Sequence, residues 1–163
     1  MHPPGLPSLA LDALQVLTAR VVHEDASPWI PSSTPGKFSR PLIFLANDRG
    51  FVELLRMEPG TAMPVHRHTG EVHVFNVRGS RQLCTGERVE AGDYVYERAG
   101  LCDGWMVLGD EPLLALVVVM GEVQFLDADG KVCARASAAT QRADYVRHCV
   151  QCGLPLADLS ERE

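Results

Sequence analysis

The spacing of glycine in the middle of the chain constrains the fold more than any other feature. Eleven of the 14 glycines lie between Gly50 and Gly130, roughly one every eight residues. Short strands separated by turns at this spacing are typical of an all-β sandwich or barrel. The runs between the glycines, rich in Val, Phe, Tyr and Leu, are Phe51–Met57, Val72–Arg78, Asp93–Glu97, Trp105–Leu108, Leu113–Met120 and Val123–Leu126.

Three kinds of segment carry further predictions. The run Leu113–Met120 is apolar at every position, which predicts a strand buried on both faces. The segments Asn47–Gly50 and Asp127–Gly130 predict hairpin turns. The stretch from Pro28 to Pro41 is rich in Pro and Ser and predicts a long loop.

The period of the sequence changes near the C-terminus, where apolar residues recur at helical spacing. Ser137 is suited to capping a helix and Gly153 to ending it. We expect one amphipathic helix packed on the barrel through Ala139, Ala143, Val146 and Val150. The predicted organisation is an N-terminal extension over 1–18, one barrel over 19–135, and a C-terminal helix and tail over 136–163.

Composition excludes several classes of protein. A chain of 163 residues suits one domain, and a net charge of −6 without a Lys/Arg cluster argues against nucleic acid as the main partner. No apolar run is long enough to span a bilayer, and the N-terminus lacks the features of a signal peptide. Five cysteines do not suit a disulfide-stapled secreted domain, so we expect a reduced cytoplasmic protein without a membrane partner.

Three of the six histidines fall within eight residues: His66, His68 and His73. Residues i and i+2 of a strand point to the same side, so His66 and His68 are able to offer two imidazoles to one point. Imidazole suits iron, zinc, copper or nickel. The alternative is a pair of core histidines that only make hydrogen bonds.

The segment from Gly60 to Gly79 resembles the first motif of the cupin superfamily, G-x5-H-x-H-x3-4-E-x6-G. The stretch from Gly92 to Asp103 resembles the second motif, G-x5-P-x-G-x2-H. More narrowly, H-x-H-T-G-E-V-H followed by Y-x-Y-E-x-A-G is similar to the 2,4'-dihydroxyacetophenone dioxygenase-like cupins. These are also called ChrR-like cupins, after an anti-sigma factor with this fold. The resemblance covers roughly residues 20–130 and implies a single cupin, or jelly-roll-type, β-barrel.

The chain departs from both motifs. The Glu slot of the first motif falls at Val72 or His73, and Asp103 stands where the second has His. Two histidines and a carboxylate on one face of a metal form the facial triad of non-haem Fe(II) oxygenases, so His66, His68 and Asp103 are the candidate ligands. The alternative for Asp103 is a loop aspartate that accepts backbone N–H bonds beside Gly104. His73 and Glu87 are weaker candidates.

The resemblance implies one divalent metal, with Fe(II) favoured over Zn(II), Ni(II) or Mn(II). The function that follows is a dioxygenase cleaving a C–C bond beside a carbonyl in a small diketone or hydroxy-ketone. The alternatives are a non-catalytic metal- or ligand-binding cupin, acting as sensor or store, and a cupin isomerase or lyase. The expected partners are a small-molecule substrate and, from the resemblance, a second copy in a homodimer.

Other side chains are able to shape a cavity. Arg56, Arg78 and Arg81 are candidates for holding an anionic substrate, although a solvated strand face is the more common place for such residues. Aromatic side chains on barrel strands are first of all core residues, but four of them are also candidates for lining a pocket: Phe75, Tyr94, Tyr96 and Trp105.

Overall fold

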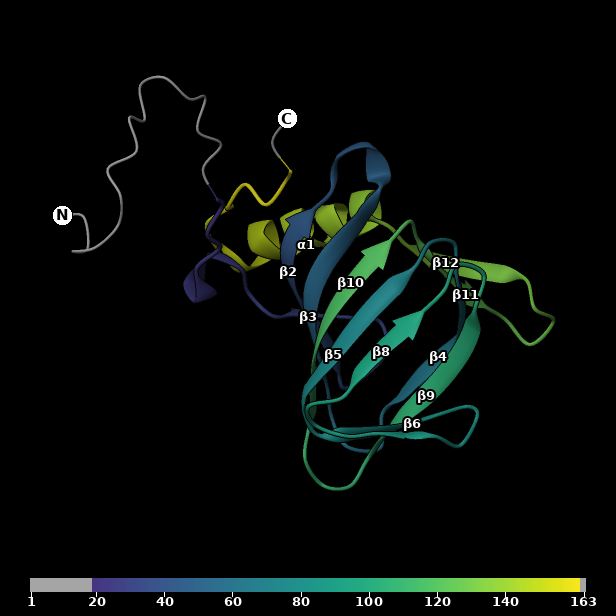
Figure 1. Cartoon of the computed structure of the whole chain (residues 1–163). Helices are drawn as coiled ribbons and strands as arrows, with labels where there is room; N and C mark the ends of the chain where they lie inside the picture. The colour runs from purple at the N-terminus through teal and green to yellow at the C-terminus, as the bar shows by residue number, and fades with distance from the viewer. Residues whose placement is uncertain (1–18, 162–163) are drawn as a thin grey trace, which may run out of the picture.

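A computed structural model describes residues 19–161 and shows two six-stranded sheets face to face (Figure 1). The first sheet runs in the order β1 (Ile30–Pro31), β2 (Lys37–Phe44), β3 (Gly50–Met57), β10 (Leu113–Met120), β5 (Val72–Arg78), β8 (Tyr94–Glu97). The second runs β12 (Val132–Ala136), β11 (Val123–Leu126), β4 (Ala62–His68), β9 (Cys102–Leu108), β6 (Ser80–Leu83), β7 (Arg88–Val89). The helix α1 (Ala138–Cys152) follows the last strand. The predicted all-β barrel with one C-terminal helix is confirmed.

Alternation along the strands builds the core between the two sheets. In β3, Phe51, Glu53, Leu55 and Met57 are buried, while Val52, Leu54 and Arg56 are half-buried. Every pairing between neighbouring strands is antiparallel, so alternate residues of each strand face the interior together. A charged residue at an inward position of such a strand therefore lies inside the barrel. Glu53 and Glu97 are two examples.

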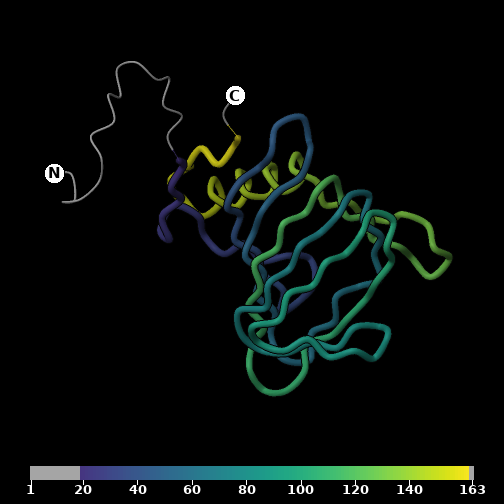
Figure 2. Tube along the Cα trace, viewed as in Figure 1, coloured from purple at the N-terminus to yellow at the C-terminus, as the bar shows by residue number. Residues whose placement is uncertain are grey.

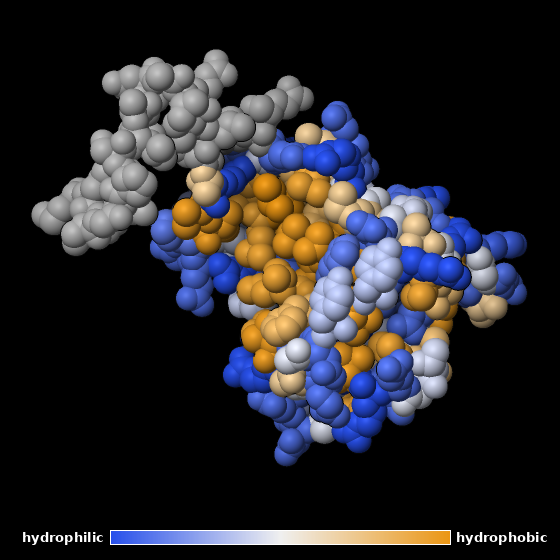
Figure 3. Space-filling model, in the orientation of Figure 1, coloured by the Kyte–Doolittle hydropathy of each residue, from blue (hydrophilic) through white to orange (hydrophobic). Residues whose placement is uncertain are grey.

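The structure corrects the prediction for β10. Leu113, Ala115, Val117 and Val119 are buried in the core, but the residues between them are only half-buried on the outer face of the first sheet. The uniform apolar run therefore reflects one buried face and one apolar face that is partly open to solvent. Figure 3 shows the broad hydrophobic area that results on this side of the molecule.

The predicted loop from Pro28 to Pro41 is wrong at Ile30–Pro31, which form β1, and from Lys37 onward, where β2 begins. Pro41 is tolerated inside the strand because the pairing of β2 with β3 shifts register between Pro41 and Ile43. The following turn, through the 3-10 helix Ala46–Asp48, reverses the chain as predicted. A Cβ on Gly50 would lie 2.1 Å from the carbonyl oxygen of Val119, so this position requires glycine.

The helix is present as predicted, with a Ser137 capping box and Gly153 in the left-handed conformation after its last residue. Its predicted packing face is wrong. Ala139, Ala143 and Val150 are exposed, and Val146 is half-buried. The residues buried are Ala138, Tyr145 and Cys149.

Tyr145 decides this orientation of the helix. Its hydroxyl bonds to both backbone groups of Ala157, accepting from the nitrogen and donating to the oxygen. Its ring also packs against Phe44 with centroids 6.1 Å apart. A large side chain with a satisfied hydroxyl buries more surface than the smaller residues of the predicted stripe.

The two ends of the described chain lie together at the helical end of the barrel (Figure 2). Arg20 bonds to the carbonyl oxygen of Ser160, and Ser160 also forms a parallel bridge with Phe44. Between residues 19 and 161, no helix is long and apolar enough to cross a bilayer. The predicted N-terminal extension, 1–18, lies outside the described residues.

Candidate functional site

The two histidines of the first motif lie side by side on the inner face of β4. His66 and His68 are only 4% and 3% exposed, and their ring centroids are 4.8 Å apart. A register shift between Met63 and His66 accommodates Pro64 within the strand. The predicted juxtaposition of the two imidazoles is present in the structure.

One hydrogen bond determines the tautomer of His66. Its Nδ1 lies 2.7 Å from the carbonyl oxygen of Pro64. A carbonyl oxygen only accepts, so Nδ1 carries the proton and Nε2 keeps its lone pair. Burial is the main reason that the pKa of His66 lies below its usual value. The ring is therefore held neutral and oriented, which is the form that binds a metal.

The ring of His68 meets a carboxylate from the opposite sheet. Its Nε2 lies 2.9 Å from Oε2 of Glu97, the last residue of β8. This contact lacks the alignment of a hydrogen bond, and both ring nitrogens of His68 are buried without a hydrogen-bond partner. Buried polar atoms in folded proteins are almost always paired, so these nitrogens indicate a place for a bound group.

A buried guanidinium lies beside this cluster. Arg81 of β6 is 1% exposed and stacks on Trp105, with its central carbon 4.6 Å from the ring centroid. Its Nε and one terminal nitrogen, Nη2, have no hydrogen-bond partner. Burial lowers the pKa of Arg81, and the carboxylates of Glu97 and Asp103 oppose that effect. Arginine keeps its charge in such surroundings, so the cluster holds one fixed cation.

Asp103 lies where the second motif predicts, directly opposite His66 on β9. It is buried, but Oδ1 accepts hydrogen bonds from the backbone nitrogens of Gly104 (2.8 Å) and Cys84 (3.3 Å). The backbone role considered as its alternative is therefore present. These bonds occupy only Oδ1, and a ligand role for Asp103 stays a prediction.

The structure does not bring the two weaker candidates to the histidine pair. His73 lies on the outer face of the first sheet, where Nδ1 is 2.6 Å from the hydroxyl of Tyr94 and Nε2 is 3.5 Å from Glu71. Glu87 is exposed in the turn between β6 and β7. His73 faces outward because alternate residues of β5 face inward, and these are Val72, Val74 and Asn76.

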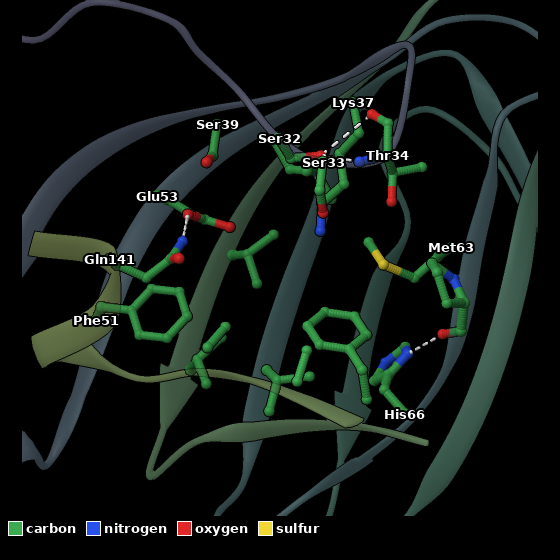
Figure 4. A pocket seen from close by; sticks show the side chains of 18 of the residues that line it. Ser32, Ser33, Thr34, Lys37, Ser39, Phe51, Glu53, Met63, His66 and Gln141 are labelled. Carbon is green, nitrogen blue, oxygen red and sulfur yellow. Dashed lines mark hydrogen bonds between the residues drawn. The ribbon is translucent and has the colours of Figure 1, made fainter. Parts of the chain in front are cut away.

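A cavity of about 580 Å³ opens between the sheets, and both histidines line it. This volume suits a small-molecule ligand. Figure 4 shows part of its wall, with His66 on one side and Lys37 and Glu53 across from it. Its lining includes Arg81, Glu97 and Trp105, apolar residues of β3 and β10, and the α1 residues Gln141, Asp144, Arg147, His148 and Gln151.

Of the three arginines proposed to face a cavity, Arg81 is the one that lines it. Arg56 stacks on Trp29 and Phe38, and Arg78 is exposed near Glu111. Of the four aromatic candidates, Trp105 lines the cavity, whereas those on β5 and β8 are exposed on the outer face: Phe75, Tyr94 and Tyr96.

Sequence reasoning missed Glu97, Lys37 and Glu53. Two of them could have been found from strand alternation. Glu97 occupies the inward position after Val95, and Glu53 the inward position between Phe51 and Leu55. Lys37 was missed because the prediction placed it in a loop.

Glu53 forms the polar end of the cavity opposite the histidines. It is 8% exposed, and Oε2 accepts a hydrogen bond from Nε2 of Gln141 at 3.0 Å. Burial raises the pKa of Glu53, while the charge of Lys37 and hydrogen bonds from Gln141 and Ser39 partly oppose the rise. The folded protein therefore favours the neutral form of this carboxyl more than the unfolded chain does.

Replacing Glu53 with glutamine is expected to stabilise the protein at alkaline pH. Because the folded-state pKa is raised, the wild type loses stability as pH rises from about 4.5 through that pKa. Glutamine mimics the neutral acid and removes the cost. We expect the melting temperature at pH 8 to rise by about 2–4 °C, the change that about 1 kcal/mol produces in a domain of this size. Thermal unfolding at pH 8 and pH 4.5 checks this, and a gain that persists unchanged at pH 4.5 would contradict it.

The donor set fits a divalent metal in part. His66 offers an oriented Nε2, His68 offers unpaired nitrogens, and Glu97 supplies a carboxylate beside them. Neutral imidazoles with a hard oxygen ligand suit Fe(II), Zn(II), Ni(II) or Mn(II). Within residues 19–161, however, no three His, Cys, Asp or Glu side chains are already grouped as a metal-binding set. The described residues thus hold a histidine pair without a complete three-ligand set.

Solved structures show the same fold. An RmlC-like cupin protein from Ralstonia eutropha JMP134 is 24% identical, with a TM-score of 0.84 over 95% of this chain and 100% of that one. An acetylacetone dioxygenase from Acinetobacter johnsonii is 15% identical, with a TM-score of 0.70 over 82% and 94%. A putative acetylacetone dioxygenase from Methylibium petroleiphilum PM1 is 17% identical, with a TM-score of 0.72 over 81% and 97%. No curated protein matches the chain.

A family model identifies the family of the chain, which structural similarity at such low sequence identity does not. The model of the ChrR Cupin-like domain matches residues 18–108, which is more than half of the chain. The match spans both predicted motifs and the strands that carry His66, His68, Arg81, Glu97 and Asp103. The chain therefore belongs to the ChrR Cupin-like domain family of the cupin superfamily.

Proposed function

We propose that this protein is a metal-dependent dioxygenase that cleaves a carbon–carbon bond beside a carbonyl group in a small diketone or hydroxy-ketone. The observation that carries the proposal is the buried pair His66 and His68 on the wall of a 580 Å³ cavity, with the His66 ring oriented and the His68 ring without a hydrogen-bond partner. Cupin domains commonly bind a divalent metal, and Fe(II) is the one we favour. The fold shared with two dioxygenase-named structures adds support.

The ligands we propose are His66, His68 and one carboxylate. Asp103 is the carboxylate that the motif spacing predicts, and Glu97 is the one that lines the cavity beside His68. A bound divalent metal would act as a Lewis acid toward two substrate oxygens. The hydrogen bond from His66 to Pro64 would orient one ligand in advance, and the charge of Arg81 interacts favourably with both carboxylates.

The proposed reaction balances without an added reductant. In a β-diketone, the bond between one carbonyl carbon and the central carbon breaks together with the O–O bond. One oxygen atom of O2 ends in a carboxylic acid and the other in an α-keto aldehyde. The substrate carbons supply all four electrons that reduce O2. The apolar residues of β3 and β10 on the cavity wall would keep bulk water away from this step.

The test combines elemental analysis with O2 uptake. Wild-type protein reconstituted with Fe(II) is expected to hold close to one iron and to consume O2 with at least one member of a panel of β-diketones and hydroxyacetophenones. Metal lost from Glu97→Gln but kept by Asp103→Asn would assign the third ligand to Glu97, and the reverse to Asp103. Iron bound without O2 uptake by any member would overturn the dioxygenase proposal.

A second candidate function is a non-catalytic metal- or ligand-binding domain. The observation that favours it is that the described residues hold no complete three-ligand set and that Glu97 is engaged with His68. Tight Zn(II) binding without turnover, in air and under anaerobic conditions, would support this function. Anaerobic conversion of a substrate would instead indicate an isomerase or lyase.

We also propose that a second copy of this chain covers the outer face of the first sheet. Phe75, Tyr94 and Tyr96 are 45%, 58% and 54% exposed there, beside the half-buried outer residues of β10. This is the hydrophobic side in Figure 3. In a two-fold dimer the same apolar sheet face meets itself, so no partner of different chemistry is needed.

Light scattering after gel filtration is expected to give twice the 17.8 kDa of one chain. Phe75→Glu places a charge in the proposed interface and is expected to yield monomer without loss of circular dichroism. Val65→Glu, an exposed apolar site on β4 of the other sheet, is the matched control and should remain dimeric. A monomeric wild type, or a dimeric Phe75→Glu protein, would contradict the proposal.

A further inference from the structure

A second polar cluster lines the same cavity, away from the histidines. It consists of Lys37 and Ser39 on β2, Glu53 on β3 and Gln141 on α1. In Figure 4 the Lys37 and Glu53 side chains extend into the space that His66 faces from the other side. The cavity therefore has polar groups at two ends and apolar walls between them.

The amine of Lys37 has no oxygen partner among residues 19–161. Its nitrogen lies 5.2 Å from the centroid of the Phe125 ring, and no hydrogen bond or ion pair to a carboxylate is formed. Glu53 influences Lys37 through its charge but is bonded to Gln141 instead. Burial lowers the pKa of the Lys37 amine.

Lys37 is half-buried on the cavity wall, and an amine that loses part of its hydration without gaining an acceptor costs stability. The other lysine of the chain, Lys131, is exposed in the turn between β11 and β12. Packing therefore gives no reason for an amine at position 37. A bound anion would supply the missing acceptors and charge.

The amine is also close enough to the histidines to act on the same ligand. Phe125 pairs with His66 across β11 and β4, and their ring centroids are 5.9 Å apart. The Phe125 ring therefore neighbours both the Lys37 amine and the His66 ring. A single small molecule that passes over the Phe125 ring would reach both.

We propose that the ligand of this cavity is a small dicarbonyl or hydroxy-ketone that carries a carboxylate, and that Lys37 binds this carboxylate while the two ketone oxygens lie toward His66 and His68. The inference rests on the proposed function for the orientation of the ketone end. The hydroxyl of Ser39 and the carboxyl of Glu53, whose pKa is raised by burial, complete the polar end as hydrogen-bonding groups.

The test compares two probes of matched carbon skeleton by titration calorimetry on the full-length, Zn(II)-loaded protein. The probes are 4,6-dioxoheptanoate, which carries the carboxylate, and heptane-2,4-dione, which does not. We expect wild type to bind the anionic probe about tenfold to a hundredfold more tightly, the range given by one hydrogen bond to a charged group. Lys37→Met should abolish this preference, Lys37→Arg should keep it, and Lys131→Met is the matched control that should leave it unchanged.

Equal affinity for the two probes in wild type, or an unchanged preference in Lys37→Met, would overturn the inference. A melting temperature of Lys37→Met at or above that of wild type excludes misfolding as the cause. The two proposals fail separately. A carboxylate preference without O2 uptake would contradict only the dioxygenase, and O2 uptake without a carboxylate preference would contradict only the ligand class.

Discussion

A protein in which His66 and His68 are both replaced by alanine is expected to lose all specific binding of divalent metal. In the proposed site the two rings supply the nitrogen ligands, and no other pair of histidines among residues 19–161 has ring centroids at a comparable 4.8 Å. Because changes to residues that merely orient ligands already cost about 10–100-fold in metal affinity, loss of one ligand should cost at least about 100-fold, or about 2.7 kcal/mol.

Elemental analysis after dialysis and competition with a chelating dye measure this effect. His73→Ala is the matched control, because His73 belongs to the same motif but lies on the outer face against Tyr94. The control should bind metal as wild type does. Equal metal content in wild type and in the doubly substituted protein would refute the metal site as we propose it.

The second large effect concerns Arg81. Replacing Arg81 with methionine is expected to lower the free energy of unfolding of the metal-free protein by about 1–3 kcal/mol. The methionine keeps most of the aliphatic stem against Trp105, but the buried carboxylates of Glu97 and Asp103 lose the cation that balances them. Two like charges left in the interior are costly because little solvent screens them.

Urea denaturation at neutral pH measures the loss. Arg78→Met removes an exposed arginine of β5 and should change the stability by no more than about 0.5 kcal/mol. Divalent metal provides positive charge near the same carboxylates, so the loss should be smaller in the metal-loaded protein. A metal-free Arg81→Met protein as stable as the control would show that the carboxylates do not depend on this guanidinium.

The sequence predicts the fold and the histidine pair because both depend on local periodicity. The parity of His66 and His68 is fixed within three residues of one strand, whatever the neighbouring strands do. Sheet order is not needed to reach that conclusion. The strand boundaries of β5, β10 and β11 agree with the predicted runs for the same reason.

The remainder of the site depends on pairings between distant segments. Glu97 reaches His68 from the opposite sheet, and Lys37 is 88 positions from Phe125 in the chain, so neither contact has a local signature. Asp103 lies opposite His66, and its bonds to Cys84 and Gly104 depend on how β6 and β9 meet. The helix face was mispredicted because Tyr145 packs against Phe44 and Ala157, far away in sequence.

The helix contributes to the cavity without belonging to either sheet. Gln141, Asp144, Arg147, His148 and Gln151 project from α1 onto the cavity wall, and none of them takes part in a strand pairing. Substitutions at these positions leave the ladders of the barrel and the histidine pair untouched. One helix can therefore vary the shape and charge of the cavity wall while the strands keep the histidine pair in place.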